Sequence, residues 1–261
     1  MEIVITPDPQ AAATIAADAI ERLLLNSTEP VLGLATGSSP LPTYQELIDR
    51  YRSGRITFAN GRAFLLDEYV GLEADHREAY RTFIERELTG QVDLPASALF
   101  GPDGNADQLT TAAERYEQLI SDAGGIDLQL LGIGSDGHIG FNEPTSSLGS
   151  RTRLKTLTDA TRTDNARFFD DDISAVPRHV LTQGIGTILE ADHLILLATG
   201  ASKARPIAQA IEGPLMAMVP ASALQLHPHA TVIIDEAAAE GLSHSDYYRE
   251  AFANKPAWQH I

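Results

Sequence analysis

The stretch IDLQLLGIGSDGHIGFNEP, residues 126–144, decides the fold because a buried strand leads directly into a polar, glycine-rich loop. The first six residues are mostly apolar, which is typical of a strand inside a sheet. The glycines that follow let the backbone turn sharply and bring Asp136, His138 and Glu143 into one small volume. Histidine titrates near neutral pH, so a neighbouring carboxylate can tune it as a proton carrier. The stretch therefore predicts an active-site loop at the end of a strand.

Short apolar runs of the same kind alternate with helical patterns along the whole chain. Buried strands are expected at residues 2–5, 31–35, 63–66, 126–131, 193–198 and 231–234. Helices are expected at residues 11–25, 42–52, 80–88, 109–122, 203–211 and 236–242. This alternation predicts an α/β fold of three αβα layers, with a mainly parallel, Rossmann-like sheet covered by helices on both faces. Ligands bind such sheets at the carboxyl ends of the strands, where the polar motifs of this sequence fall.

Length and composition favour a single domain over residues 1–261, because a chain of 261 residues can bury one large core and its glycine and proline clusters mark loops. No apolar run approaches the roughly 18 residues of a membrane-spanning helix. The first residues carry neither a basic region nor a long hydrophobic one, so we expect a cytoplasmic protein without a membrane partner. The absence of cysteine excludes disulfides, thiolate metal sites and thiol catalysis.

The formal net charge of −17 argues against a nucleic-acid partner, because a phosphate backbone requires a basic face. Acidic residues outnumber basic ones 36 to 19, and Lys155, Lys203 and Lys255 are the only lysines. Excess carboxylate with little lysine is typical of halophilic proteins, whose self-repulsion is screened by salt. An ordinary acidic enzyme is the other interpretation.

A first motif, LATGSSP, leaves a predicted strand and enters a predicted helix. Free backbone N–H groups at a helix start and the hydroxyls of Thr36, Ser38 and Ser39 can bind a phosphate, with Gly37 shaping the turn. The motif is neither a Walker loop nor a dinucleotide-binding loop. Plain capping of the helix by serine or threonine is the alternative.

A second motif, FLLDEYVG, places Asp67 and Glu68 side by side at the end of an apolar run. Neighbouring residues of a strand point to opposite sides, so the two carboxylates should have different roles. One of them in the site could act as a general base toward a carbon-bound proton. The alternative is a solvated pair or a helix cap.

The opening loop also has other interpretations. Its Asp136 and His138 could simply bond the backbone of a turn. They could ligate a metal, but no third and fourth ligands follow at a familiar spacing, so we expect no metal. The interpretation we favour is a proton relay, in which a carboxylate on one imidazole nitrogen leaves the other free for substrate.

Two cations complete the set of candidates, each near a predicted strand end or helix start. Arg167 can bind a phosphate with two parallel hydrogen bonds, and Lys203 can bind it as a point charge. Either could instead form a surface ion pair.

Several of these motifs, in this order, resemble the glucosamine-6-phosphate deaminase family over the whole chain. The stretches that carry the resemblance are the LATGSS loop, LDEYVGL at 66–72, GSDGHIGFNEP at 134–144, SSLGSRTR at 146–153, RFFD at 167–170 and LQLHP at 224–228. The resemblance implies conversion of glucosamine 6-phosphate and water into fructose 6-phosphate and ammonia, with no cofactor and no catalytic metal.

The resemblance also implies a role for each candidate residue. His138 would move the proton that opens the sugar ring, positioned by Asp136 and Glu143, and Asp67 would carry the proton between C2 and C1. The phosphate would lie on Gly37, Ser38 and Ser39, with Arg167 and Lys203 as its cationic partners.

Allosteric members of the family bind N-acetylglucosamine 6-phosphate at a subunit interface in a hexamer, which implies a homo-oligomer here. Residues matching that second phosphate site are Ser146, Arg153, Lys155 and Thr156. The match is partial, because Arg249 stands where members carry a C-terminal tyrosine, next to Tyr248.

Two alternative functions stay open for the sequence. One is a sugar-phosphate hydrolase of the 6-phosphogluconolactonase kind, which would not need Asp67 as a carbon base. The other is a non-catalytic sugar-phosphate sensor, which would normally carry an output module.

Overall fold

A seven-stranded sheet lies at the centre of the computed structural model, which describes residues 1–256 and 258–261. Its paired strands all run parallel. In spatial order they are β1 (Glu2–Thr6), β10 (Ala230–Asp235), β9 (His193–Ala198), β6 (Leu128–Leu131), β2 (Val31–Leu34), β3 (Arg62–Leu65) and β5 (Leu99–Phe100). The six expected strands are all present, with small shifts at their ends, and the short β5 was not predicted. The expected α/β class is confirmed.

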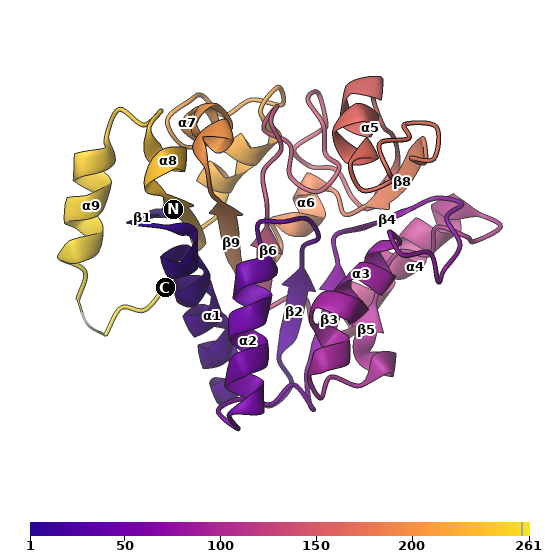
Figure 1. Ribbon diagram of the computed structural model, residues 1–261, viewed down its shortest axis with the longest axis horizontal. Helices are drawn as coiled ribbons and strands as arrows, with labels where there is room; N and C mark the ends of the chain where they lie inside the picture. The colour runs from indigo at the N-terminus through magenta and orange to yellow at the C-terminus, as the bar shows by residue number, and fades with distance from the viewer. Residues whose placement is uncertain (257) are drawn as a thin grey trace.

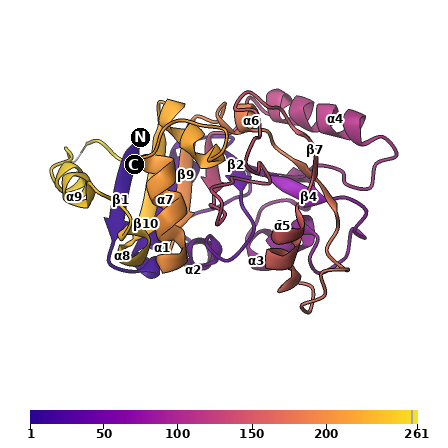
Figure 2. The same cartoon turned by 90° about the horizontal axis from the view of Figure 1, so that it is seen from above.

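Helices cover both faces of this sheet. In Figure 1, α1 and α2 lie in front of the strands, and the view from above in Figure 2 places α4 on the opposite side. Every residue of β9 and β10 is buried, which fits the apolar runs 194–198 and 232–234 within them. The helices are α1 (Pro9–Asn26), α2 (Leu41–Arg52), α3 (Tyr80–Glu87), α4 (Leu109–Asp122), α5 (Asp159–Ala166), α6 (Ile185–Ile188), α7 (Ala204–Ile211), α8 (Glu236–Ala239) and α9 (Ser245–Ala253), with 3₁₀ turns at Thr89–Gln91, Ala96–Ala98, Ala201–Lys203 and Pro220–Leu226.

The expected helix at 236–242 is shorter in the structure and ends at Ala239. Gly241 explains the early end, because a Cβ on it would lie 2.7 Å from the carbonyl oxygen of Ala204, so the chain passes very close to the start of α7 there. Of the described residues, none belongs to a helix long and apolar enough to cross a membrane.

A second, smaller sheet was not predicted. It is antiparallel and contains β4 (Asp67–Tyr69), β8 (His179–Thr182) and β7 (Arg153–Thr156), in that order. Only Leu66 separates β4 from β3, so the chain passes from the main sheet into the small one at that residue. The small sheet has its own core, built by Tyr69, Phe141, Phe169 and Val180 among others.

Gly33, in β2, allows the side chain of Gln129 in the neighbouring β6 to lie across it. A Cβ on Gly33 would come within 2.0 Å of Gln129 Oε1 and 2.3 Å of Cδ. We expect Gly33→Ala to lower the free energy of unfolding by about 3 kcal/mol, since overpacking a dense core costs about this much. Chemical denaturation measures the change.

The matched control is the same substitution in a Gln129→Ala background, where the clashing atoms are absent. There, Gly33→Ala should cost less than about 1 kcal/mol, and the difference between the two backgrounds isolates the clash. An equal cost in both would show that Gln129 is not the cause.

Candidate active site

One cavity of about 560 Å³ at the carboxyl ends of the central strands brings most of the candidate residues together. Its size is in the range of small-molecule sites. The strands point upward in Figure 1, and the loops that carry the motifs lie at their upper ends. The candidates among its lining residues are Thr36, Gly37, Ser38, Ser39, Asp67, His138, Arg167 and Lys203. Asp136, Glu143 and the four residues of the expected second site are not among them.

His138 lies directly over the backbone of Gly134. A Cβ on Gly134 would be 2.2 Å from Cε1 and 2.4 Å from Nε2 of the imidazole, so only glycine fits beneath the ring. The backbone N–H of Gly134 donates to the carbonyl of His138 at 2.9 Å, which closes the loop. This glycine therefore serves close packing of the imidazole rather than flexibility.

Asp136 contacts the imidazole from the same loop. Its Oδ1 lies 2.7 Å from Nδ1 of His138 and also accepts the backbone N–H of His138 at 3.1 Å. The contact with Nδ1 is short but bent, and no well-aligned hydrogen bond to this nitrogen occurs in the described part of the chain. The histidine contact, followed in size by the opposing effect of burial, leaves the pKa of Asp136 below its ordinary value. Asp136 thus remains an anion beside the ring and favours a proton on Nδ1, the nitrogen that faces its carboxylate.

Asp67 is the most strongly perturbed carboxyl group of the cavity. It is buried at the first position of β4, opposite Thr182 of β8. Burial, and then the charge of Glu68, raise its pKa well above 3.8. Gly140 leaves space over the carboxylate, because the position of a Cβ there is only 3.6 Å from Asp67 Oδ2 and 3.0 Å from Thr182 Oγ1. A buried carboxylate that faces a cavity and has a raised pKa is suited to be a general base near neutral pH.

The neighbouring Glu68 has a different function. Its carboxylate accepts the backbone N–H groups of Tyr69, Tyr80 and Arg81 at 2.9–3.0 Å. The last two belong to the first turn of α3, which has no cap from its own N-cap residue, Ala79. Glu68 therefore caps α3, while Asp67 faces the cavity.

The residues from Thr36 to Ser39 line the cavity at the start of α2. Gly37 has φ +92°, a left-handed conformation that favours glycine. The N-cap of α2 is Pro40, and no side chain of the described chain caps this helix start. The capping alternative is therefore not what the structure shows, and Thr36, Ser38 and Ser39 all line the cavity.

Two cations line the same cavity. Lys203 Nζ donates to the carbonyl of Ile133 at 2.7 Å, and burial, with the nearby charge of Arg167, lowers its pKa. The guanidinium of Arg167 lies 4.7 Å from the ring centre of Phe168. Within the described residues, neither cation has a carboxylate within ion-pair distance, so their charge is available to an anion in the cavity.

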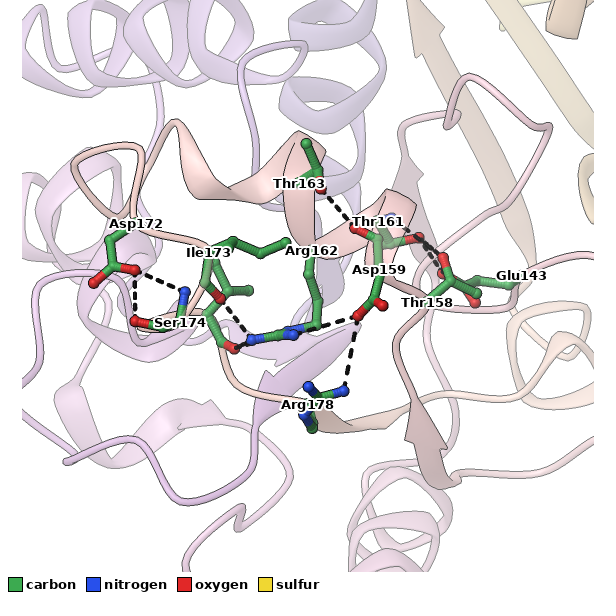
Figure 3. A network of polar contacts seen from close by, with 11 residues as sticks. Glu143, Thr158, Asp159, Thr161, Arg162, Thr163, Asp172, Ile173, Ser174 and Arg178 are labelled. Atoms are coloured by element: carbon green, nitrogen blue, oxygen red, sulfur yellow. Dashed lines mark hydrogen bonds and ion pairs between the residues drawn. The ribbon is translucent and has the colours of Figure 1, made fainter.

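Glu143 does not line the cavity. It connects residues 132–144, called the histidine loop below, to α5, as Figure 3 shows. Its Oε1 accepts a hydrogen bond from Thr161 and a longer one of 3.5 Å from Thr158, the N-cap of α5. Arg162 in the same figure is buried and donates to the carbonyls of Ile173 and Val176, which holds the turn after α5 in place. Because Arg167 directly follows α5, Glu143 links the histidine loop to the segment that carries a cation.

Asn142 was not predicted, yet it has the densest hydrogen bonding in the loop. Its Nδ2 donates to the carbonyls of Ile139 at 2.9 Å and Gln183 at 2.8 Å, and its Oδ1 accepts from Arg153 at 2.8 Å. Gln183 in turn donates through its backbone N–H to the carbonyl of Leu66, next to Asp67. A buried polar network therefore joins the histidine loop, the small sheet and the strand junction that carries Asp67.

We expect Asn142→Leu to lower the free energy of unfolding by about 2–4 kcal/mol. The side chains have nearly the same shape, but leucine removes three hydrogen bonds in a largely buried place, two to carbonyls and one from Arg153. Urea denaturation measures the effect. Asn254→Leu is the matched control, because Asn254 is exposed and makes a single side-chain bond to the carbonyl of Glu250. Similar costs for the two variants would contradict a special role of Asn142.

The residues of the expected second site lie around β7. Arg153 and Lys155 are half-buried and Thr156 is exposed on this edge strand. Ser146 is buried, and its hydroxyl makes no hydrogen bond within the described chain. Arg153 is already engaged with Asn142, and burial lowers its pKa.

The described residues include no cluster of three or more histidine and carboxylate side chains arranged to hold a metal ion. The expectation that no metal takes part stays a prediction.

The fold and the cavity together define a parallel α/β protein whose cavity is lined by carboxylates, a histidine, hydroxyl groups and two cations. The family profile described as glucosamine-6-phosphate isomerases/6-phosphogluconolactonase matches residues 8–233. The chain belongs to this family.

Relatives that match over their full length have a narrower description. A glucosamine-6-phosphate deaminase of Beutenbergia cavernae is 59% identical over 259 residues, 99% of each chain. One of Mycolicibacterium smegmatis is 57% identical over 261 residues, 100% of each chain. Among solved structures, a glucosamine-6-phosphate deaminase described as monomeric has a TM-score of 0.90 and 41% identity, covering 92% of this chain and 100% of its own. A 6-phosphogluconolactonase of Trypanosoma brucei, at 20% identity and a TM-score of 0.70 over 93% of this chain and 98% of its own, shares the fold.

Proposed function

We propose that this protein converts glucosamine 6-phosphate and water into fructose 6-phosphate and ammonia. The observation that carries the proposal is the meeting of Asp67, His138 and the Thr36–Ser39 loop in one cavity. Full-length relatives described as glucosamine-6-phosphate deaminases support the same reaction.

The first chemical step is opening of the sugar ring. We assign the proton transfer between the ring oxygen and the C1 hydroxyl to His138, with Asp136 fixing the charge of the imidazole through the 2.7 Å contact. Oxygen-to-oxygen proton transfer suits an imidazole, because its nitrogen can both accept and donate a proton. Glu143 supports this step indirectly, by holding the loop against α5.

The second step moves a proton between two carbons. Asp67 takes the proton from C2, giving an enolamine, and a proton returned to C1 gives a ketimine-like species. Water adds to C2 of that species, and ammonia leaves. The raised pKa of Asp67 matches a base that must both accept and return a proton. No redox cofactor or metal enters this scheme.

The phosphate group is assigned to the Thr36–Ser39 loop and the two cations of the cavity. The loop Thr36, Gly37, Ser38 and Ser39 offers hydroxyls and a helix start, and Arg167 and Lys203 offer two cations. Held there, the phosphate would fix the sugar with respect to Asp67 and His138.

Ammonia release tests the proposal directly. Purified protein given glucosamine 6-phosphate should release ammonia and fructose 6-phosphate in equal amounts. A protein that only hydrolyses 6-phosphogluconolactone would instead be a lactonase, and one that binds phosphosugars without turnover would be a sensor. Either result would overturn the deaminase assignment.

We further propose a cytoplasmic homo-oligomer in which Ser146, Arg153, Lys155 and Thr156 form a second phosphosugar site. The exposed edge strand β7 and the unpartnered hydroxyl of Ser146 support a ligand at this place, whereas the relative described as monomeric argues that the fold does not require assembly. N-acetylglucosamine 6-phosphate should change the substrate saturation curve. An unchanged curve, with a monomer in sedimentation, would remove both proposals.

A further inference from the structure

Three carboxylates of the described chain line the cavity, and they lie in different places. Asp164 belongs to α5, one turn before Arg167, and its charge acts on Lys203. Because it lies one turn before Arg167, we assign it to the part of the cavity that binds the phosphate. Asp67 lies below Gly140. The third carboxylate, Glu78, has no role in the scheme above.

Glu78 lines the cavity from the segment that leads into α3. Its backbone N–H donates to Nδ1 of His76 at 3.1 Å, and the His76 ring stacks on Phe169 with 5.8 Å between ring centres. Two residues further on, Tyr80 packs on Tyr69 at 4.8 Å and on Phe141 at 6.0 Å. Burial, and further the charge of Asp67, raise the pKa values of both Tyr69 and Tyr80. Tyr69 lies two residues after Asp67 in β4. The segment 76–80 is thus fixed at both ends to the aromatic side chains beside Asp67.

The carboxylate of Glu78 has only a weak partner within the described chain. Arg77 lies 3.2 Å from it, but the Arg77 side chain is 82% exposed, whereas that of Glu78 is 13% exposed. Ion pairs with one solvated partner contribute little. Glu68 differs, because three backbone N–H groups satisfy its carboxylate. Glu78 therefore offers a mostly buried negative charge to whatever occupies the cavity.

We propose that Glu78 binds the ammonium group on C2 of the substrate and so selects amino sugar phosphates over other phosphosugars. The inference rests on the proposed function, in which Asp67 acts at C2. The amine is bonded to that same carbon, so it must lie at the Asp67 end of the cavity. A second carboxylate that neutralises the ammonium charge leaves Asp67 free to act as the base at C2. Of the lining carboxylates in the described chain, Glu78 is the one, besides Asp67 itself, on a segment that packs beside Asp67.

Two acyclic ligands that cannot be turned over test this assignment by calorimetry. They are 2-amino-2-deoxyglucitol 6-phosphate and glucitol 6-phosphate, which differ only in the group on C2. The unmodified protein should prefer the amine by about tenfold or more, as expected for a charge-assisted hydrogen bond in a shielded site. Glu78→Gln should reduce this preference to about threefold or less and leave the affinity for glucitol 6-phosphate unchanged, because glutamine keeps the shape without the charge.

Asp75→Asn is the matched control, because it removes one negative charge from an exposed residue of the same loop. It should leave both affinities unchanged. Retention of the amine preference by Glu78→Gln would overturn the assignment, as would an equal loss of affinity for both ligands, which would mean that Glu78 only supports the loop. The ammonia assay on the unmodified protein tests the proposed function separately. Ammonia release with no effect of Glu78→Gln on selectivity would leave the function standing and remove this inference alone.

Discussion

Asp67→Asn is expected to lower kcat for ammonia release by about a thousandfold or more, since an amide cannot accept the C2 proton and general-base catalysis contributes about 10²–10⁴-fold. Exchange of the C2 hydrogen with deuterated solvent, followed by NMR, should be lost in parallel. Asp75→Asn, with the same change at an exposed site, should keep both activities. Retained exchange in Asp67→Asn would remove Asp67 from the role of base.

The same variant should be more stable than the parent protein at neutral pH. Burial, followed by the charge of Glu68, raises the pKa of Asp67 above its ordinary 3.8. Between these two pKa values the folded protein binds more protons than the unfolded one, so the stability of the parent falls as pH rises through that window. Asparagine does not ionise and avoids this loss. Melting temperatures should coincide below about pH 3.8 and separate at neutral pH. A less stable variant at neutral pH would contradict the raised pKa of Asp67.

His138→Gln is expected to lower kcat on the cyclic substrate by about a hundredfold. Glutamine fills much of the same space but cannot take up and release a proton. Spontaneous ring opening should then limit turnover. With enough of the variant present, the rate of ammonia release should stop increasing with enzyme concentration, which progress curves measure. His179→Gln, at an exposed histidine outside the cavity, is the control. Unchanged turnover by His138→Gln would contradict its role in ring opening.

The main sheet could be predicted because each of its long strands is buried on both faces and therefore reads as an apolar run. The small sheet could not. Its strand β4 is only three residues long and begins with two carboxylates, and β7 alternates half-buried with exposed residues. These segments pair because of contacts with residues far along the chain, such as Asp67 opposite Thr182. Local pattern contains no information about such pairings.

The same difference between local sequence patterns and long-range contacts applies to the candidate site. The residues in motifs, such as His138 and the Thr36–Ser39 loop, were visible because glycines and polar side chains interrupt apolar runs. A helix cap was one interpretation of the Asp67–Glu68 pair, but the sequence did not show that Glu68 caps α3. The role of Asn142 was not visible, since it depends on Gln183 and Arg153. Glu78 had no signal in the sequence at all. Its place depends on how His76 meets Phe169, more than ninety residues away in the chain.

The position of Asp67 at the junction of the two sheets has a consequence for refolding. The carboxylate reaches its place only when β4 has paired with β8 and when the backbone N–H of Gln183 has bonded the carbonyl of Leu66. Closing such a long loop costs chain entropy before the contacts between the paired strands can compensate for that cost. Helical circular dichroism can return as soon as α1, α2 and α4 have formed. Regain of ammonia release after denaturation therefore reports completion of this distant pairing, and it should lag behind the return of helix signal in the same experiment.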